Sequence, residues 1–125
     1  MNWKKVSTEL RELLEKSMLP FDSQKKFMFG APTYFLNNNM FAGIHQDTII
    51  IRLSEKDRKE ILSTFDEAAP FEPMAGRIMK EYIALPESVY GDADVLREWL
   101  NRSYRYALSL KPKVSKPRKP ARGGQ

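Results

Sequence analysis

The spacing of apolar residues changes from helical to strand-like about 20 residues into the chain. An amphipathic helix is predicted before Pro20, since its apolar positions recur three or four residues apart with charged residues between them: Trp3, Val6, Leu10, Leu13, Leu14 and Met18. Four runs rich in aromatic and β-branched residues then predict three or four strands: 25–29, 33–36, 40–44 and 48–53. Tight turns between these runs favour antiparallel pairing.

The second half of the chain predicts two more helices around a further strand. Ser54, with Asp57 three residues later, is typical of a helix cap, so we expect a helix to about Thr64. Its buried side is expected to hold Ile61, Leu62 and Phe65. We expect a loop at 69–73, a strand at 78–85 and a connection at 86–91.

A final helix is expected to begin at Asp92 or Asp94 and to end at Lys111-Pro112. One broad face of this helix is predicted to pack inward: Val95, Leu96, Trp99, Leu100, Ser103, Tyr104, Ala107 and Leu110. The elements follow the order α-β-β-β-α-β(β)-α, which predicts an α+β fold with an antiparallel sheet of about five strands.

Strand alternation in 49–53 predicts two sheet faces of different character. Ile49, Ile51 and Leu53 share a fully apolar face that must meet the helices, whereas Ile50 and Arg52 point the other way. The second face is therefore mixed, which suits either a half-solvated sheet or a subunit interface.

The net charge of +5 divides unevenly along the 125 residues. Residues 1–110 hold 15 basic and 16 acidic residues and are expected to form one folded domain. Residues 111–125 are expected to be a disordered, Pro-rich basic tail with no acidic residue. Its cations are Lys111, Lys113, Lys116, Arg118, Lys119 and Arg122. These cations suit contacts with nucleic-acid phosphates. The alternative is that they serve only solubility, since no aromatic residue lies between them to stack on bases.

Several classes of function are disfavoured by composition. The absence of cysteine excludes disulfides and thiolate chemistry, and no stretch reaches the roughly 20 apolar residues of a membrane span. No signal peptide is evident after Met1, so a cytoplasmic protein without membrane contact is expected. His45, the only histidine, is interpreted as a turn residue, and we expect no catalytic residue, metal or cofactor.

Four residues form a candidate contact site for a partner or an anion: Arg52, Arg77, Lys80 and Tyr82. The simpler interpretation, structural salt bridges or solvated charge, is favoured for them. The methionines of the sheet region suit either an adaptable binding surface or core filling, and core filling is favoured. These are Met28, Met40, Met74 and Met79.

Five sequence pieces in order resemble the TfoX N-terminal domain family. They are Lys26-Phe27-Met28-Phe29-Gly30, Asn39 to His45, Ile51-Arg52-Leu53-Ser54, Pro70 to Met74 and Gly76 to Tyr82. This domain occurs at the front of TfoX/Sxy competence regulators and as stand-alone proteins. The resemblance spans roughly residues 3–110 and implies a fold like the secretion chaperones, with helices on one face of an antiparallel sheet and frequent dimerisation.

The resemblance supplies no catalytic residue and leaves out the second domain of the competence regulators. We therefore expect a non-enzymatic interaction or regulatory module that forms a homodimer and binds an unknown protein partner. A weak, non-specific nucleic-acid contact through the tail is the alternative. An enzyme of unrecognised type is a third and less favoured hypothesis.

Overall fold

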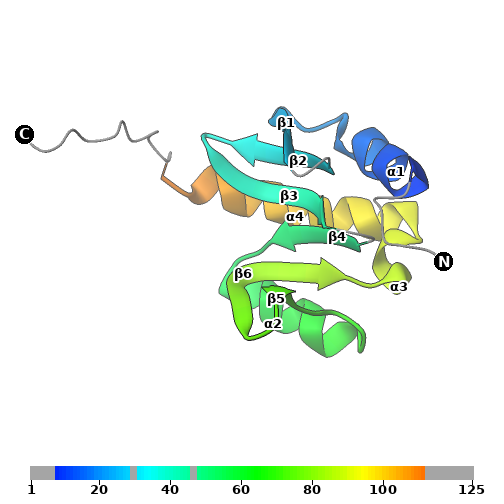
Figure 1. The fold of residues 1–125 in the computed structure, drawn as a ribbon, viewed down its shortest axis with the longest axis vertical. Coiled ribbons are helices and arrows are strands. Elements are labelled where there is room, and N and C mark those ends of the chain that lie inside the picture. Colours follow the sequence, from blue (N-terminus) through cyan, green and yellow to red (C-terminus); the bar gives the residue numbers. More distant parts are fainter. Residues whose placement is uncertain (1–7, 29–30, 46–47, 112–125) are drawn as a thin grey trace, which may run out of the picture.

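Six antiparallel strands form one open sheet in the computed structural model, which describes residues 8–28, 31–45 and 48–111 (Figure 1). The strands lie in the order β1-β2-β3-β4-β6-β5. The α+β class is confirmed, with six strands where about five were expected. The elements are α1 (Thr8–Met18), β1 (Gln24–Met28), β2 (Ala31–Leu36), β3 (Asn39–His45), β4 (Thr48–Arg52), α2 (Glu55–Thr64), β5 (Ala69–Met74), β6 (Arg77–Leu85), α3 (Glu87–Tyr90) and α4 (Ala93–Ser109).

Strand β5 occupies the segment in which the sequence analysis expected a loop, and that expectation is wrong. Pro70 and Pro73 suggested a loop because proline cannot donate to a strand ladder. The strand lies at the edge of the sheet and pairs only with β6, where a missing donor is tolerated. The expected connection at 86–91 also contains the single-turn helix α3.

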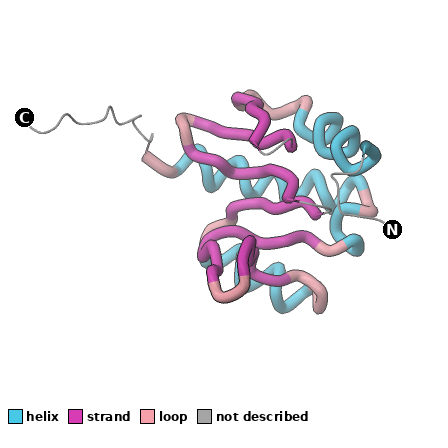
Figure 2. Tube along the Cα trace, in the orientation of Figure 1, coloured by secondary structure: helices cyan, strands magenta, loops and turns pink. Residues whose placement is uncertain are grey.

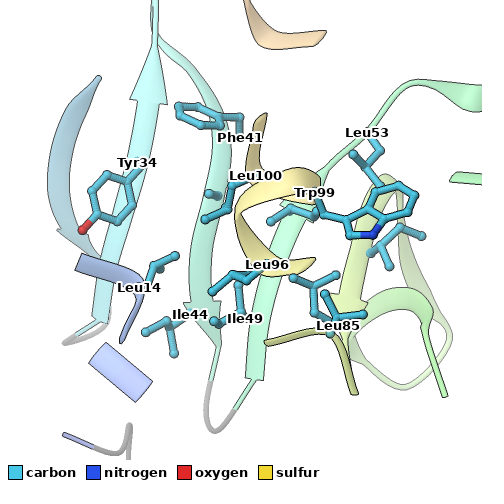
Figure 3. Close-up of a cluster of buried hydrophobic side chains, with 14 of the residues drawn as sticks. Leu14, Tyr34, Phe41, Ile44, Ile49, Leu53, Leu85, Leu96, Trp99 and Leu100 are labelled. Carbon is cyan, nitrogen blue, oxygen red and sulfur yellow. The ribbon is translucent and has the colours of Figure 1, made fainter. Parts of the chain in front are cut away.

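The longest helix, α4, crosses one face of the sheet behind β3 and β4 (Figures 1 and 2). Register places Ala42, Ile51 and Ile83 side by side on this face. Leu96 and Leu100 of α4 are fully buried among these strands, and Figure 3 shows them facing the sheet. The apolar face predicted from strand alternation therefore meets the helices, as expected.

A β-bulge in β3 brings two consecutive side chains to the helix-covered face. Tyr34 pairs with Ala42 and Phe35 with Met40, so Phe41 is the extra residue. Phe41 and Ala42 are both fully buried in the core. Two hydroxyl groups donate to carbonyl oxygens at this bulge: Ser103 Oγ to Phe41, and Tyr82 Oη to Met40, each at 2.9 Å.

The predicted starts of α2 and α4 are confirmed by their caps. Ser54 Oγ accepts from the amide of Asp57 at 3.3 Å, and an Asp92 carboxylate oxygen accepts from two amides at the start of α4. Helix α2 ends at Thr64, as expected. On its inward side Ile61 is buried and Phe65 is partly buried, but Leu62 is exposed, which corrects the prediction for that residue.

Candidate interaction surface

The sheet face opposite α4 carries a cross-strand row that runs through all six strands. We call it the open face, because none of the described helices crosses it in Figure 1. Its row consists of Lys26, Thr33, Gly43, Ile50, Ala84 and Ala69. Ile50 lies on this face as predicted but is only 3% exposed. The Met40 methyl group lies against Gly43 in the same row.

Arg52 is the last residue of β4 and is held by a carboxylate. Its Nε donates to Glu81 Oε1 at 2.7 Å, and its guanidinium lies 5.6 Å from the Tyr82 ring and 6.0 Å from the Tyr106 ring. Burial alone would raise the pKa of Glu81. The hydrogen bond and charge of Arg52 outweigh burial, with help from Tyr106 and Arg58, and the pKa of Glu81 is lowered.

The four residues of the candidate contact site occupy two places in the structure. Arg52 and Tyr82 are cross-strand partners, and Tyr82 donates to the Met40 carbonyl. Arg77 and Lys80 are exposed on the part of β6 that precedes its pairing with β4. Arg77 pairs instead with Met74 at the end of the β5–β6 hairpin. The arrangement therefore separates an ion-paired arginine from two exposed cations.

The end of the β5–β6 hairpin exposes three large apolar side chains. Met74 and Ile78 are each 58% exposed, and Met79 is 37% exposed. With Arg77 and Lys80 they make up what we call the hairpin patch, which covers both sides of the hairpin, because the consecutive strand residues Ile78 and Met79 point to opposite sides. Core filling, the favoured interpretation of the sheet methionines, is wrong for Met74 and Met79. The sequence analysis missed this patch because it expected a loop at 69–73, where β5 pairs with β6.

The turn of this hairpin depends on Gly76. Its φ of +81° is a backbone conformation that side chains with a Cβ rarely adopt. The Gly76 amide donates to Glu72 Oε2 at 2.6 Å, which fixes the acidic side chain beside the turn. The hairpin patch is therefore carried on a defined turn that also holds a carboxylate.

A charged cluster between α2 and α4 borders a hollow of about 450 Å³. Arg102 donates to Glu60 and Glu98 at 2.9 Å and to Asp57 at 3.2 Å, and its guanidinium lies 4.2 Å from the Trp99 ring centre. The hydrogen bond from Arg102 lowers the pKa of Glu60. These contacts tie α2 to α4. The sequence signal for them was limited to the i,i+4 pair of Glu98 and Arg102.

His45 ends β3 and packs edge-on against Phe71, with ring centres 5.0 Å apart. It is therefore a strand-end residue rather than part of the turn, and residues 46–47 lie outside the description. Within the described ranges no group of three or more potential ligands is placed to hold a metal ion. In the same ranges, no helix is long and apolar enough to cross a membrane.

Only the first residue of the predicted tail falls within the description. The Lys111 carbonyl accepts a hydrogen bond from Asn39 Nδ2 at 3.0 Å, which fastens the end of α4 to the start of β3. The remaining tail cations lie outside the described residues: Lys113, Lys116, Arg118, Lys119 and Arg122.

Comparison with known proteins gives one family. The sequence model of the TfoX N-terminal domain matches residues 10–107, from the first described helix to the last turns of α4. No curated protein matches the chain significantly. The match covers most of the chain and the whole sheet, and the resemblance seen in the sequence pieces is confirmed. The chain belongs to the TfoX N-terminal domain family.

Proposed function

We propose that this protein is a non-enzymatic interaction module of the cytoplasm, with a regulatory role, and that it pairs with a second copy of itself through the hairpin patch. The observation that carries the proposal is the exposure of Met74, Ile78 and Met79 at the end of the β5–β6 hairpin. Large apolar side chains left exposed around one structural element are typical of protein interaction sites. Methionine side chains in particular adapt to the shape of a partner.

The charges around the hairpin patch suit a two-fold contact between identical copies. Such a contact must be self-complementary, because each copy presents the same surface to the other. Arg77 and Lys80 are exposed beside the apolar side chains, and Glu72 is held at the turn by the Gly76 amide. A two-fold axis through the patch lets Glu72 of one copy meet the cations of the other.

The proposal is tested by comparing Ile78→Lys with Leu108→Lys in sedimentation experiments on the full chain at micromolar to high micromolar concentration. Leu108 is a matched control, because it is 53% exposed but lies on α4. We expect the unmodified protein and Leu108→Lys to form dimers. Ile78→Lys is expected to be monomeric, because the new charge would have to be buried without a partner.

Two results contradict the proposal. A strictly monomeric unmodified protein at high micromolar concentration rules out self-association. A dimer that survives in Ile78→Lys places the interface elsewhere than the hairpin patch. Circular dichroism of both variants confirms that each change leaves the fold intact.

A second candidate function is non-specific nucleic-acid binding through the basic tail, because the positive excess of the chain lies in residues 111–125. The test keeps the chain at full length, since the Lys111 carbonyl contacts Asn39. Replacing the six tail cations by Gln is expected to abolish DNA and RNA binding at low salt. Equal binding by both proteins in a filter assay contradicts this candidate.

A further inference from the structure

The two edges of the sheet differ in their capacity to accept another strand. The β5 edge contains Pro70 and Pro73, which lack amide donors, and its pairing with β6 is interrupted by two register shifts. The β1 edge contains no proline, and its five residues pair with β2 in continuous register from Gln24 to Met28. Strand addition is therefore open to β1 and obstructed at β5.

The two faces of β1 present different chemistry. Phe27 points to the α1 side of the sheet, where the Arg11 guanidinium and Lys25 Nζ lie 5.7 Å and 5.1 Å from its ring centre. It is nevertheless 57% exposed, which leaves much of the ring free for another contact. Lys26 points to the open face as the first member of the cross-strand row.

The two lysines of β1 differ in their electrostatic surroundings. Lys25 Nζ pairs with Glu15 of α1 at 2.5 Å, so its charge is balanced within the domain. Lys26 Nζ lies 4.9 Å from the Phe35 ring centre, and none of the described carboxylates forms an ion pair with it. The β1 edge therefore carries one uncompensated cation, on the open face.

This cation disfavours a second copy of the chain as the added strand. Two β1 strands paired antiparallel about their centre would place Lys26 directly opposite Lys26 of the other copy. Like charges in that position destabilise a strand pair. An edge lysine of this kind is also how sheets resist self-association. A strand that carries a carboxylate at the same position meets attraction instead.

We propose that β1 binds an extended acidic segment of another protein as a seventh strand of the sheet. Backbone hydrogen bonds to the outer edge of β1, which pairs with no further strand among the described residues, would supply affinity, as in other cases of strand addition. A carboxylate opposite Lys26 and an apolar residue opposite Phe27 would supply selectivity. The site lies at the opposite edge of the sheet from the hairpin patch and does not depend on self-association.

The test uses a labelled, end-blocked octapeptide in which Glu alternates with Val and one central Phe, and a control peptide with Lys for each Glu. Fluorescence anisotropy with the full chain is expected to show binding of the acidic peptide, weakened by salt, and about tenfold weaker binding of the basic one. Amide exchange at Gln24 to Met28 is expected to slow when the acidic peptide is added.

Lys26→Glu and Lys56→Glu make a matched pair of variants, since both lysines are exposed and Lys56 lies on α2. Lys26→Glu is expected to exchange the preference between the two peptides, and Lys56→Glu to leave it unchanged. Equal binding of both peptides, equal effects of the two variants, or amides of β1 that are all protected before peptide is added each overturn the proposal. If Lys26 serves only to prevent strand pairing at the β1 edge, the acidic peptide does not bind. This result also overturns the proposal.

Discussion

Ser103 Oγ donates a hydrogen bond to the carbonyl oxygen of Phe41, the extra residue of the bulge in β3, at 2.9 Å. A bulge interrupts the strand ladder, so its carbonyl needs a donor from elsewhere. Ser103 and Phe41 are both fully buried. The contact therefore connects the centre of α4 to the irregular point of the sheet.

Replacing Ser103 by Ala is expected to lower the free energy of unfolding by about 1–3 kcal/mol, because a buried acceptor loses its donor. Ser109→Ala is the control on the same helix, since Ser109 is exposed and its Oγ donates to a carbonyl of its own helix. We expect the control to change stability by less than about 0.5 kcal/mol. Urea denaturation measures both values, and equal values for the two variants contradict the role given to Ser103.

The contact of Glu60 with Arg102 predicts a loss of stability in acid. The pKa of Glu60 is lowered in the folded protein from an ordinary value of 4.5, chiefly by the hydrogen bond from Arg102. A carboxylate with a lowered folded pKa stabilises the protein above its unfolded pKa, and this contribution is lost as the pH falls through the folded pKa. Glu60→Gln should therefore be less stable than the unmodified protein at pH 7, with the difference shrinking below pH 4.5.

Thermal unfolding of both proteins between pH 3 and pH 7 measures this difference. Glu67→Gln serves as control, because Glu67 is exposed and forms no ion pair with the described residues. A stability difference between Glu60→Gln and the unmodified protein that stays constant across this range contradicts the linkage.

Gly91 is required by a close contact rather than by an unusual backbone angle. Its φ is −77°, but a Cβ at this position would lie 2.7 Å from the Glu87 carbonyl oxygen. Gly91→Ala is expected to cost about 1–3 kcal/mol, as in other overpacked sites. At Gly43 an added Cβ would lie 3.4 Å from the end of the flexible Met40 side chain, so Gly43→Ala should cost less. Chemical denaturation compares the two.

Arg52 and Glu81 should behave as a structural pair. A double-mutant cycle with Arg52→Met and Glu81→Gln is expected to give a coupling energy of at most about 1 kcal/mol, because Glu81 is partly solvated. If Arg52 instead bound an anion, Arg52→Met would remove phosphate binding, while the coupling energy between Arg52 and Glu81 would stay near zero. Denaturation and phosphate titration of the four proteins distinguish these outcomes.

The elements that could be predicted from the sequence are those with strong local signals. Ser54 and Asp92 mark helix starts by side chains that cap the next amides, and the run of isoleucines in β4 indicates a buried central strand. These features depend on neighbours in the chain, so their pattern is visible without the fold.

The features that escaped prediction depend on distant partners. Proline in β5 is tolerated only because β5 lies at an edge, and the exposure of Ile78 follows from the hairpin that β5 forms. Arg52 was recognised as a charge on the mixed sheet face, but Glu81, which holds it, lies 29 residues away. Spacing along the chain carries no signal for such pairs.

The prolines of β5 also bear on the stoichiometry of assemblies. A sheet with two receptive edges can join edge to edge without limit, since a head-to-tail contact that does not close a ring grows into a filament. Here the obstructed β5 edge offers no docking place for β1 of a neighbouring molecule. If β1 accepts a strand as proposed, growth by strand pairing therefore stops after a single addition.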